Sequence, residues 1–326
     1  MKKALTILLP LAIGFLMIWY NFKDTTPEQI ANIKSAVLNA DYFWLLLSII
    51  MGIFSHVSRA IRWKYTLKAV DANYSFLNSL FSVFISYLVN LAIPRAGELS
   101  RVAVFSRYEN NPFDKTLSTV VAERVVDFII LLIILGSVFL IQFETITEAI
   151  TTAQAQQTTQ DGGTNYLTYI ILILAVLAGI FVVRNKKFKT KIKDFLVGLF
   201  DGLKSIWKMD GKTQFLGHTL IIWILYLAMF WVSIYCLPQT SHLGFGAILT
   251  AFAAGGIGMV ISNGGFGTFP FLISLTLLNY GVESDYGTAF GWIMWISQTL
   301  MIVVCGTLSY ILINALNKNK DEAKDI

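Results

Sequence analysis

Long apolar segments alternate with short polar ones along the whole chain. Each segment approaches or exceeds the roughly 20 residues that a helix needs to cross a bilayer. Lipid offers no hydrogen-bond partner to an exposed backbone, so we expect these segments to be helices embedded in a membrane. They are Ala4–Tyr20, Tyr42–Ser58, Phe76–Ile93, Leu117–Phe143, Tyr166–Val183, Phe215–Leu237, Gly246–Leu278 and Tyr286–Leu316.

The composition excludes a soluble globular protein. Of the 326 residues, 56% are hydrophobic and only 14% are charged, whereas soluble domains carry about 25% charged residues. Lys2 and Lys3 before the first segment resemble the start of a signal peptide. No small-residue cleavage site follows, so this segment is predicted to be an uncleaved anchor. We expect no nucleic-acid partner.

The charges of the loops predict an orientation. Arg184–Thr213 holds nine Lys or Arg residues and should face the cytoplasm by the positive-inside rule, as should Arg59–Lys68. Glu144–Asn165 has three acidic residues and no basic one, and should face outward. The basic residues near both ends of the chain favour cytoplasmic termini, in a bacterial inner membrane if the resemblance described below holds.

Two apolar segments must return to the side that they left if these assignments are correct. Phe76–Asn111 is interrupted by Pro94 and Gly97, and Gly246–Tyr280 is interrupted at Asn263–Pro270. Both are predicted to be re-entrant hairpins; the alternative for the second is two ordinary spans joined by a tight turn. The expected fold is an all-α polytopic membrane protein, with about six full spans and two opposed hairpins in an inverted repeat. Its halves would be residues 1–143 and 166–316 of a single membrane domain, 1–326.

Charged residues inside an apolar segment are candidates for function. Glu123, Arg124 and Asp127 lie within Leu117–Phe143 and share one broad helix face. Each charge at membrane depth costs at least about 2.5–3.5 kcal/mol. We therefore favour a buried site or proton relay over the alternative, a cluster that reaches the cytoplasmic interface.

The two breaks offer groups that suit a phosphate. Arginine binds phosphate through two parallel hydrogen bonds, and consecutive glycines let backbone amides converge on an anion. The alternatives are a basic collar at the interface that includes Arg107 and close helix packing through small residues. The candidate residues are Arg95, Glu98 and Arg101 at the first break, Gly264, Gly265 and Gly267 at the second, and Arg59 and Arg62 as further headgroup contacts.

Four motifs together resemble one family, the transmembrane region of lysylphosphatidylglycerol synthases, often called flippase-like. The resemblance covers nearly the whole chain and implies movement of a lipid or its headgroup between leaflets. The soluble aminoacyl-transferase domain of two-domain members is not expected here, and neither is its synthase activity. The motifs are Arg59-Ala-Ile-Arg62-Trp63, Asn90…Pro94-Arg-Ala-Gly97-Glu98…Arg101, Glu123-Arg124…Asp127 and Asn263-Gly-Gly-Phe-Gly267.

One departure from the family pattern affects the assignment of the acidic group. The second break of the family commonly reads Pro-Gly-Gly-x-Gly-x-x-Glu, but this chain has Asn263 at the place of the proline and Pro270 at that of the glutamate. Glu98, Glu123 or Asp127 would have to supply the carboxylate.

The predicted function is a flippase for a phospholipid or polyprenyl-phosphate type of lipid, with anionic lipids and a lipid-synthesising enzyme as partners. No catalytic, metal-binding or nucleotide-binding motif is present, so neither enzyme activity nor a cofactor is expected. Two alternatives stay open: a transporter or channel for a small anion or ion, and a membrane partner of a lipid-modifying enzyme that transports nothing.

Overall fold

The computed structural model describes residues 2–93, 96–142 and 186–322, and within these ranges all regular structure is helical. The all-α membrane architecture expected from the sequence is confirmed. The helices of the first half are α1 (Lys2–Phe22), α2 (Pro27–Leu38), α3 (Tyr42–Lys68), α4 (Phe76–Ala92), α5 (Gly97–Glu109) and α6 (Phe113–Ile141). Those of the second half are α9 (Lys186–Lys208), α10 (Lys212–Ser233), η1 (Ile234–Cys236), α11 (Phe245–Ile261), η2 (Asn263–Gly265), α12 (Thr268–Leu278) and α13 (Ser284–Glu322).

Four helices of the described residues are long and apolar enough to cross a membrane. They cover Tyr42–Lys68, Phe113–Ile141, Lys212–Cys236 and Ser284–Lys318. Many of their large apolar side chains are exposed on the outside of the bundle, as expected for a surface that faces lipid. The predicted span Tyr166–Val183 and the acidic loop before it lie outside the described residues.

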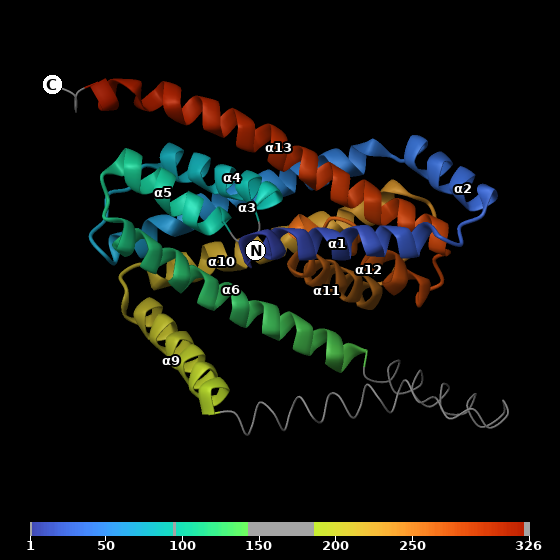
Figure 1. Cartoon of the computed structure of the whole chain (residues 1–326), viewed down its shortest axis with the longest axis horizontal. Coiled ribbons are helices and arrows are strands. Elements are labelled where there is room, and N and C mark those ends of the chain that lie inside the picture. Colours follow the sequence, from blue (N-terminus) through green and yellow to red (C-terminus); the bar gives the residue numbers. More distant parts are fainter. Residues whose placement is uncertain (1, 94–95, 143–185, 323–326) are drawn as a thin grey trace.

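Two pairs of short helices, α4 with α5 and α11 with α12, each turn back on themselves from opposite ends of the molecule (Figure 1). Their turning points meet near its centre, where Gly264 of η2 faces Leu91 of α4: a Cβ added to Gly264 would lie 2.8 Å from Leu91 Cδ2. This is the arrangement expected for two opposed hairpins. Re-entry of each pair from a single side of a membrane stays a prediction, as does the inverted repeat.

Close packing explains why the second break is rich in glycine. Gly267 has a φ of 71°, and a Cβ there would lie 2.3 Å from the carbonyl oxygen of Gly14 in α1. Only glycine adopts this backbone without strain and leaves room for the neighbouring helix. Trp295 of α13 donates a hydrogen bond of 2.7 Å to the carbonyl of Gly264. The alternative of packing through small residues therefore describes what these glycines do in the structure.

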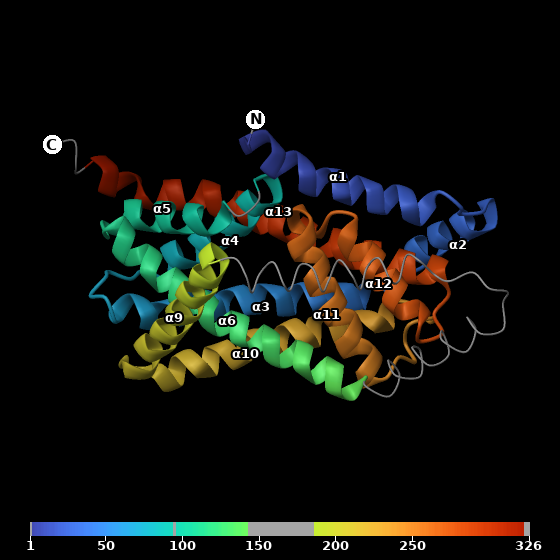
Figure 2. The same cartoon turned by 60° about the horizontal axis from the view of Figure 1, so that its bottom comes forward.

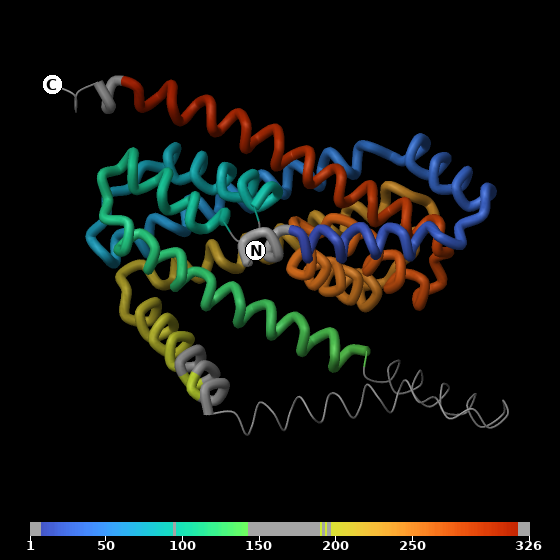
Figure 3. Tube along the Cα trace, in the orientation of Figure 1, coloured from blue at the N-terminus to red at the C-terminus, as the bar shows by residue number. Residues whose placement is uncertain are grey.

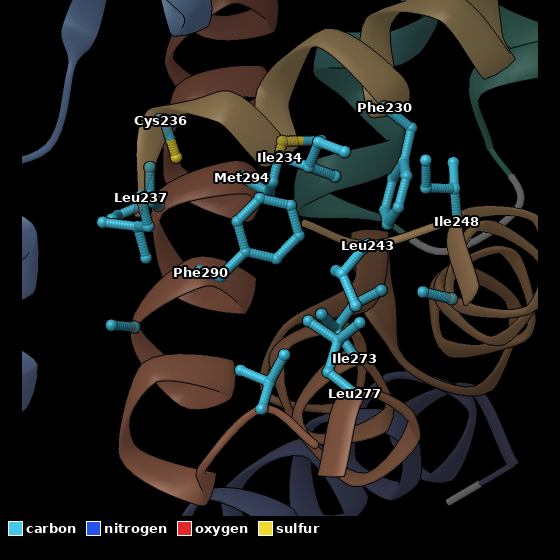
Figure 4. Packing of buried hydrophobic residues seen from close by; sticks show 14 of the residues in the cluster. Phe230, Ile234, Cys236, Leu237, Leu243, Ile248, Ile273, Leu277, Phe290 and Met294 are labelled. Carbon is cyan, nitrogen blue, oxygen red and sulfur yellow. The ribbon is translucent and has the colours of Figure 1, made fainter. Parts of the chain in front are cut away.

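The largest hydrophobic core lies around α10, α11, α12 and α13. Phe230, Ile248, Ile273 and Phe290 belong to this cluster, and their side chains point toward one another (Figure 4). Beside this core, α3 and α10 pack along each other in opposite directions (Figure 2). Of the short helices, α4 packs against α3 and α13, and α12 packs against α13.

The sequence prediction of a loop at Arg59–Lys68 is wrong, because α3 continues to Lys68. No helix breaker lies between Ser58 and Lys68, and carboxylates of α6 neutralise the two arginines inside the bundle. The sequence analysis also missed α2. Thr26 starts this helix with a capping box to Gln29, a signal that was present in the sequence.

Four of the basic segments predicted to share one side of the membrane lie together, whereas the start of α1, predicted on the same side, lies near the middle of the molecule (Figure 1). The end of α3, the end of α9, the start of α10 and the end of α13 are all found at the same end of the molecule, on the left in Figure 1. Assignment of this end to the cytoplasm stays a prediction.

Candidate functional site

Arginines and carboxylates from three helices meet at the centre of the first half of the chain. Three sequence-separated segments converge here because the short helix α5 packs against both α3 and α6. On α3 and on α6 the charged residues are one helical turn apart and so share a face. The members are Arg59 and Arg62 of α3, Glu98 and Arg101 of α5, and Glu123, Arg124 and Asp127 of α6; we call this set the arginine cluster.

Asp127 is the centre of one half of the cluster and contacts three arginines. Arg62 Nη1 lies 2.7 Å from Asp127 Oδ1, and Arg62 Nη2 lies 3.1 Å from Oδ2. Arg59 Nη1 and Arg124 Nη2 lie 3.0 and 3.2 Å from the same Oδ2. Such charge-assisted hydrogen bonds hold the carboxylate in its ionised form. Asp127 therefore fixes the directions of all three guanidinium groups.

Glu123 is the centre of the other half and is completely buried, with 0% of its side chain exposed. Arg101 Nη1 donates to its Oε2 at 2.8 Å, and Arg62 Nε lies 3.4 Å from its Oε1. The guanidinium of Arg101 also lies over the ring of Trp63, 3.8 Å from the centroid. Trp63 in turn donates a hydrogen bond of 2.8 Å to Thr119 of α6. Arg101 is thus held by Glu123 and by the Trp63 ring.

The buried part of the cluster carries a surplus of positive charge. Arg59, Arg62 and Arg101 are at most 3% exposed and face only two buried carboxylates, Glu123 and Asp127. Arg124 and Glu98 form a further pair of 3.2 Å at the half-exposed rim. Within the described part of the chain, Arg59 Nε and two nitrogens of Arg101 have no hydrogen-bond partner. Because an unbalanced buried charge is costly, this arrangement favours an added anion.

A cavity of about 580 Å³ opens beside the cluster. Arg59, Arg124 and Asp127 form its polar side. Its other walls are mostly apolar or aromatic and come from α6, α9 and α10: Val121, Val125, Phe128, Leu131, Leu199 and Trp223. We call this space the arginine cavity. Its lining is amphipathic, with charge on one side and hydrocarbon on the others.

A second cavity of about 340 Å³ adjoins the first, and its walls are almost entirely apolar. The two share Tyr87, Leu131, Trp223 and Tyr226. The hydroxyl of Tyr226 lies 3.2 Å from Arg59 Nη2 and 3.3 Å from the Tyr87 hydroxyl, so polar groups line the boundary between the cavities. Gly264 of the second break lines the second cavity. The cavities therefore run from the arginine cluster toward the second break.

The structure brings most of the predicted site residues together. Glu98, Arg101, Glu123, Arg124 and Asp127 all belong to the cluster, with Arg124 and Asp127 lining the cavity. Arg59 and Arg62 belong to it as well. The alternative of an interfacial collar is wrong for these two arginines, because α6 carboxylates bury and pair them.

Other predicted residues have different places. Arg95 lies outside the described residues. Asn90 accepts a hydrogen bond of 2.8 Å from the backbone amide of Gly97, and so fixes the turn between α4 and α5. Gly264 reaches the second cavity, whereas Gly265 and Gly267 line neither cavity. The second break therefore contributes to the second cavity through the shape of its backbone.

Sequence reasoning missed the aromatic residues of the site. Tyr87 and Tyr226 are hydroxyl-bearing side chains inside apolar segments, where a buried hydroxyl needs a partner. That was a usable signal. Trp63 follows Arg62 directly in the first motif, but its stacking on Arg101 could not be inferred without knowing how α5 folds back.

The chain was compared with known proteins. The family described as lysylphosphatidylglycerol synthase TM region matches residues 7–306. The UPF0104 membrane protein PH1989 of Pyrococcus horikoshii is 28% identical over 144 residues, which are 43% of this chain and 41% of that protein. The UPF0104 membrane protein MJ1595 of Methanocaldococcus jannaschii is 28% identical over 176 residues, 50% of this chain and 47% of that protein. The matches thus span less than half of each relative. No solved structure matches this chain.

Proposed function

This chain belongs to the family of the lysylphosphatidylglycerol synthase TM region, and on that premise we propose that it is a flippase for lipids with a phosphate-bearing headgroup. It is a multi-pass membrane protein. The proposal adds that the arginine cavity receives the headgroup and that the lipid passes between the leaflets along the two adjoining cavities. It involves no covalent chemistry, so we propose a transport protein that is not an enzyme.

The single observation that carries the proposal is the amphipathic lining of the arginine cavity. Arg59 and Arg124 face the same space as Val121, Phe128 and Trp223. A phosphate-bearing lipid combines an anion with hydrocarbon, and both parts find a matching wall. A small soluble anion would gain nothing from the apolar walls. The lining therefore favours a lipid over the alternative of an anion transporter.

Within this proposal the cluster divides into contact and positioning groups. Arg59 and Arg124 line the cavity and contact the phosphate. Arg62, Arg101 and Glu123 are not among the lining residues and hold the others in place. Glu123 contacts both Arg62 and Arg101; proton uptake by Glu123 or Asp127 stays a prediction. Asp127 orients both contact arginines.

The opposed helix pairs supply a route to alternating access. We propose that the two pairs and the flanking spans form an inverted repeat, and that one repeat rocks against the other about the cavities. The matched relatives are archaeal, so the bacterial inner membrane inferred from the resemblance stays a prediction. A lipid-synthesising enzyme that supplies the lipid remains part of the proposal.

A leaflet assay tests the function directly. Purified protein in liposomes would be offered fluorescent phospholipids and a polyprenyl phosphate, with an external quencher reporting which leaflet holds the label. We expect movement that Arg59→Gln abolishes. Lys64→Gln is the matched control, because Lys64 is an exposed residue of the same helix outside the cluster. Uptake of soluble phosphate in the same liposomes, without movement of any phosphate-bearing lipid, would refute the proposal in favour of an anion transporter.

A further inference from the structure

The helix α9 differs from every other element that lines the arginine cavity. The remaining wall residues come from α3, α6 and α10, which are long apolar helices, and from the shorter apolar helix α4. In contrast, α9 holds seven lysines and two aspartates in 23 residues, a net charge of +5. It lies beside α6 at the edge of the bundle (Figures 1 and 3). An amphipathic, basic helix thus forms one wall of an otherwise membrane-embedded cavity.

The inner face of α9 covers part of this side of the cavity. Leu199 lines the cavity itself. About two turns further along the same face, Ile206 is buried in a cluster with Val126 of α6. Between them, Gly202 lets α9 approach α6 closely: a Cβ added there would lie 2.9 Å from Cγ2 and 3.3 Å from Cβ of Val125. The contact is formed by a few apolar groups over about two turns, which suits a reversible closure.

The outer face of α9 is largely exposed and suits a lipid surface; Lys212 of α10 contacts it, with its Nζ 5.3 Å from the centroid of the Trp207 ring. Phe200 is 70% exposed and Trp207 is 69% exposed. Lys193, Lys204 and Lys208 are exposed on the same side of the helix. Apolar and aromatic groups beside lysines are the pattern of a helix that lies in the interface of an anionic leaflet. Such lysines are drawn to anionic headgroups.

We propose that α9 is a lateral gate of the arginine cavity, and that its outer face docks on anionic headgroups of the surrounding leaflet. This inference rests on the proposed function, since it names the entrance by which the lipid reaches the cluster. Docking holds α9 at the membrane surface and gathers anionic lipid beside Arg124 at the rim. Displacement of α9 from α6 then opens the cavity to the leaflet.

Docking is tested with a fluorescent bimane label at Phe200→Cys, in a background with Cys236→Ala and Cys305→Ala. The protein would be placed in liposomes of brominated phosphatidylcholine, with or without phosphatidylglycerol. We expect stronger quenching when the anionic lipid is present. This increase should be lost in Lys193→Gln/Lys204→Gln/Lys208→Gln, because each lysine near the surface contributes to the attraction. Equal quenching in both kinds of liposome would overturn the docking.

Gating is tested with a disulfide between Val125→Cys and Gly202→Cys. The Cβ separation of 3.3 Å is close to the roughly 3.5–4.5 Å of natural disulfides. After oxidation, Leu131→Cys on the shared wall of the two cavities would be labelled with bimane. In brominated liposomes we expect most of the quenching at residue 131 to be lost in the locked protein and to return on reduction. The control carries Gly202→Cys and the bimane label at residue 131 but keeps Val125, so it cannot form the disulfide.

The two failures are distinguishable, because neither quenching measurement requires a lipid to cross the membrane. If quenching at residue 131 is the same before and after reduction, α9 is not the gate, whatever the leaflet assay shows. If quenching depends on the lock while no lipid changes leaflet, α9 is confirmed as the entrance to a lipid site and the flippase function is refuted.

Discussion

The two breaks in this chain lie close together at the centre of the molecule, but only the first has a network of ion pairs beside it. Beside the first break, α5 contributes Arg101 and Glu98 to a network of ion pairs. At the second break, Gly264 and Gly267 are held by tight packing against α13 and α1. Close packing of a glycine is common to both breaks, since a Cβ on Gly97 would lie 2.3 Å from the carbonyl oxygen of Ser86. The ion pairs are therefore what distinguishes two regions that the inverted-repeat proposal treats as equivalents.

This difference teaches where chemical recognition and where movement should be sought. A cluster of buried ion pairs is rigid and directional, because each guanidinium has its place fixed by a carboxylate. The glycine-rich turn between α11 and α12 is held by hydrogen bonds between uncharged groups, among them Ser262 with Thr268 and Trp295 with the Gly264 carbonyl, and by close backbone packing. We therefore expect the first region to hold the headgroup and the second to form the surface along which the lipid moves.

The largest expected effect breaks the first region. Glu123→Leu leaves the buried Arg101 without its carboxylate partner and removes one of the two carboxylates that contact Arg62. Loss of one partner of a buried ion pair costs about 3–5 kcal/mol. We expect the free energy of unfolding in detergent to fall by about this amount, as measured by chemical denaturation.

A double variant separates unpaired charge from lost packing. Glu123→Leu/Arg101→Leu removes one cation together with the anion, while Arg62 keeps its two hydrogen bonds to Asp127. Most of the lost stability should return. A double variant that is as unstable as Glu123→Leu would show that the cluster is not held together by charge, and the comparison with the second break would lose its basis.

The next effect breaks the second region through shape alone. Gly267→Ala places a Cβ 2.3 Å from the Gly14 carbonyl at a φ of 71°, and strain of this kind costs about 1–3 kcal/mol. We expect a loss of that size in the same denaturation experiment, with no change in headgroup preference. Gly136→Ala is the matched control, since a Cβ on Gly136 meets nothing within 4 Å. An unchanged stability in Gly267→Ala would contradict the packing role of this break.

Sequence alone predicted the two regions to different extents. The apolar segments and their interruptions identified the helices and both breaks. In lipid, a single segment can satisfy its backbone hydrogen bonds within itself only by forming a helix. Glu123, Arg124 and Asp127 were identifiable as site residues because a charge in an apolar segment needs a partner. Their partners were not identifiable, since the pairing of Arg101 with Glu123 depends on how α5 packs against α3 and α6. The charge on Arg59 and Arg62 was assigned to a loop for the same reason.

The smallest expected effect on stability tests whether the ion pair at the rim of the arginine cluster stabilises the fold. Glu98 and Arg124 form a pair of 3.2 Å at the rim, with side chains 49% and 37% exposed. Exposed pairs contribute about 0.2–1 kcal/mol, so Glu98→Gln should change the free energy of unfolding by no more than this. Arg124 would keep Asp127 as its partner at 3.2 Å, and the rim would gain positive charge. We therefore expect tighter binding of anionic lipid, measured as stronger quenching of a bimane-labelled Leu131→Cys by a brominated anionic lipid. A large loss of stability would mean that the Glu98–Arg124 pair is needed to hold the fold together. Arg59 would then be the remaining arginine proposed to contact the phosphate.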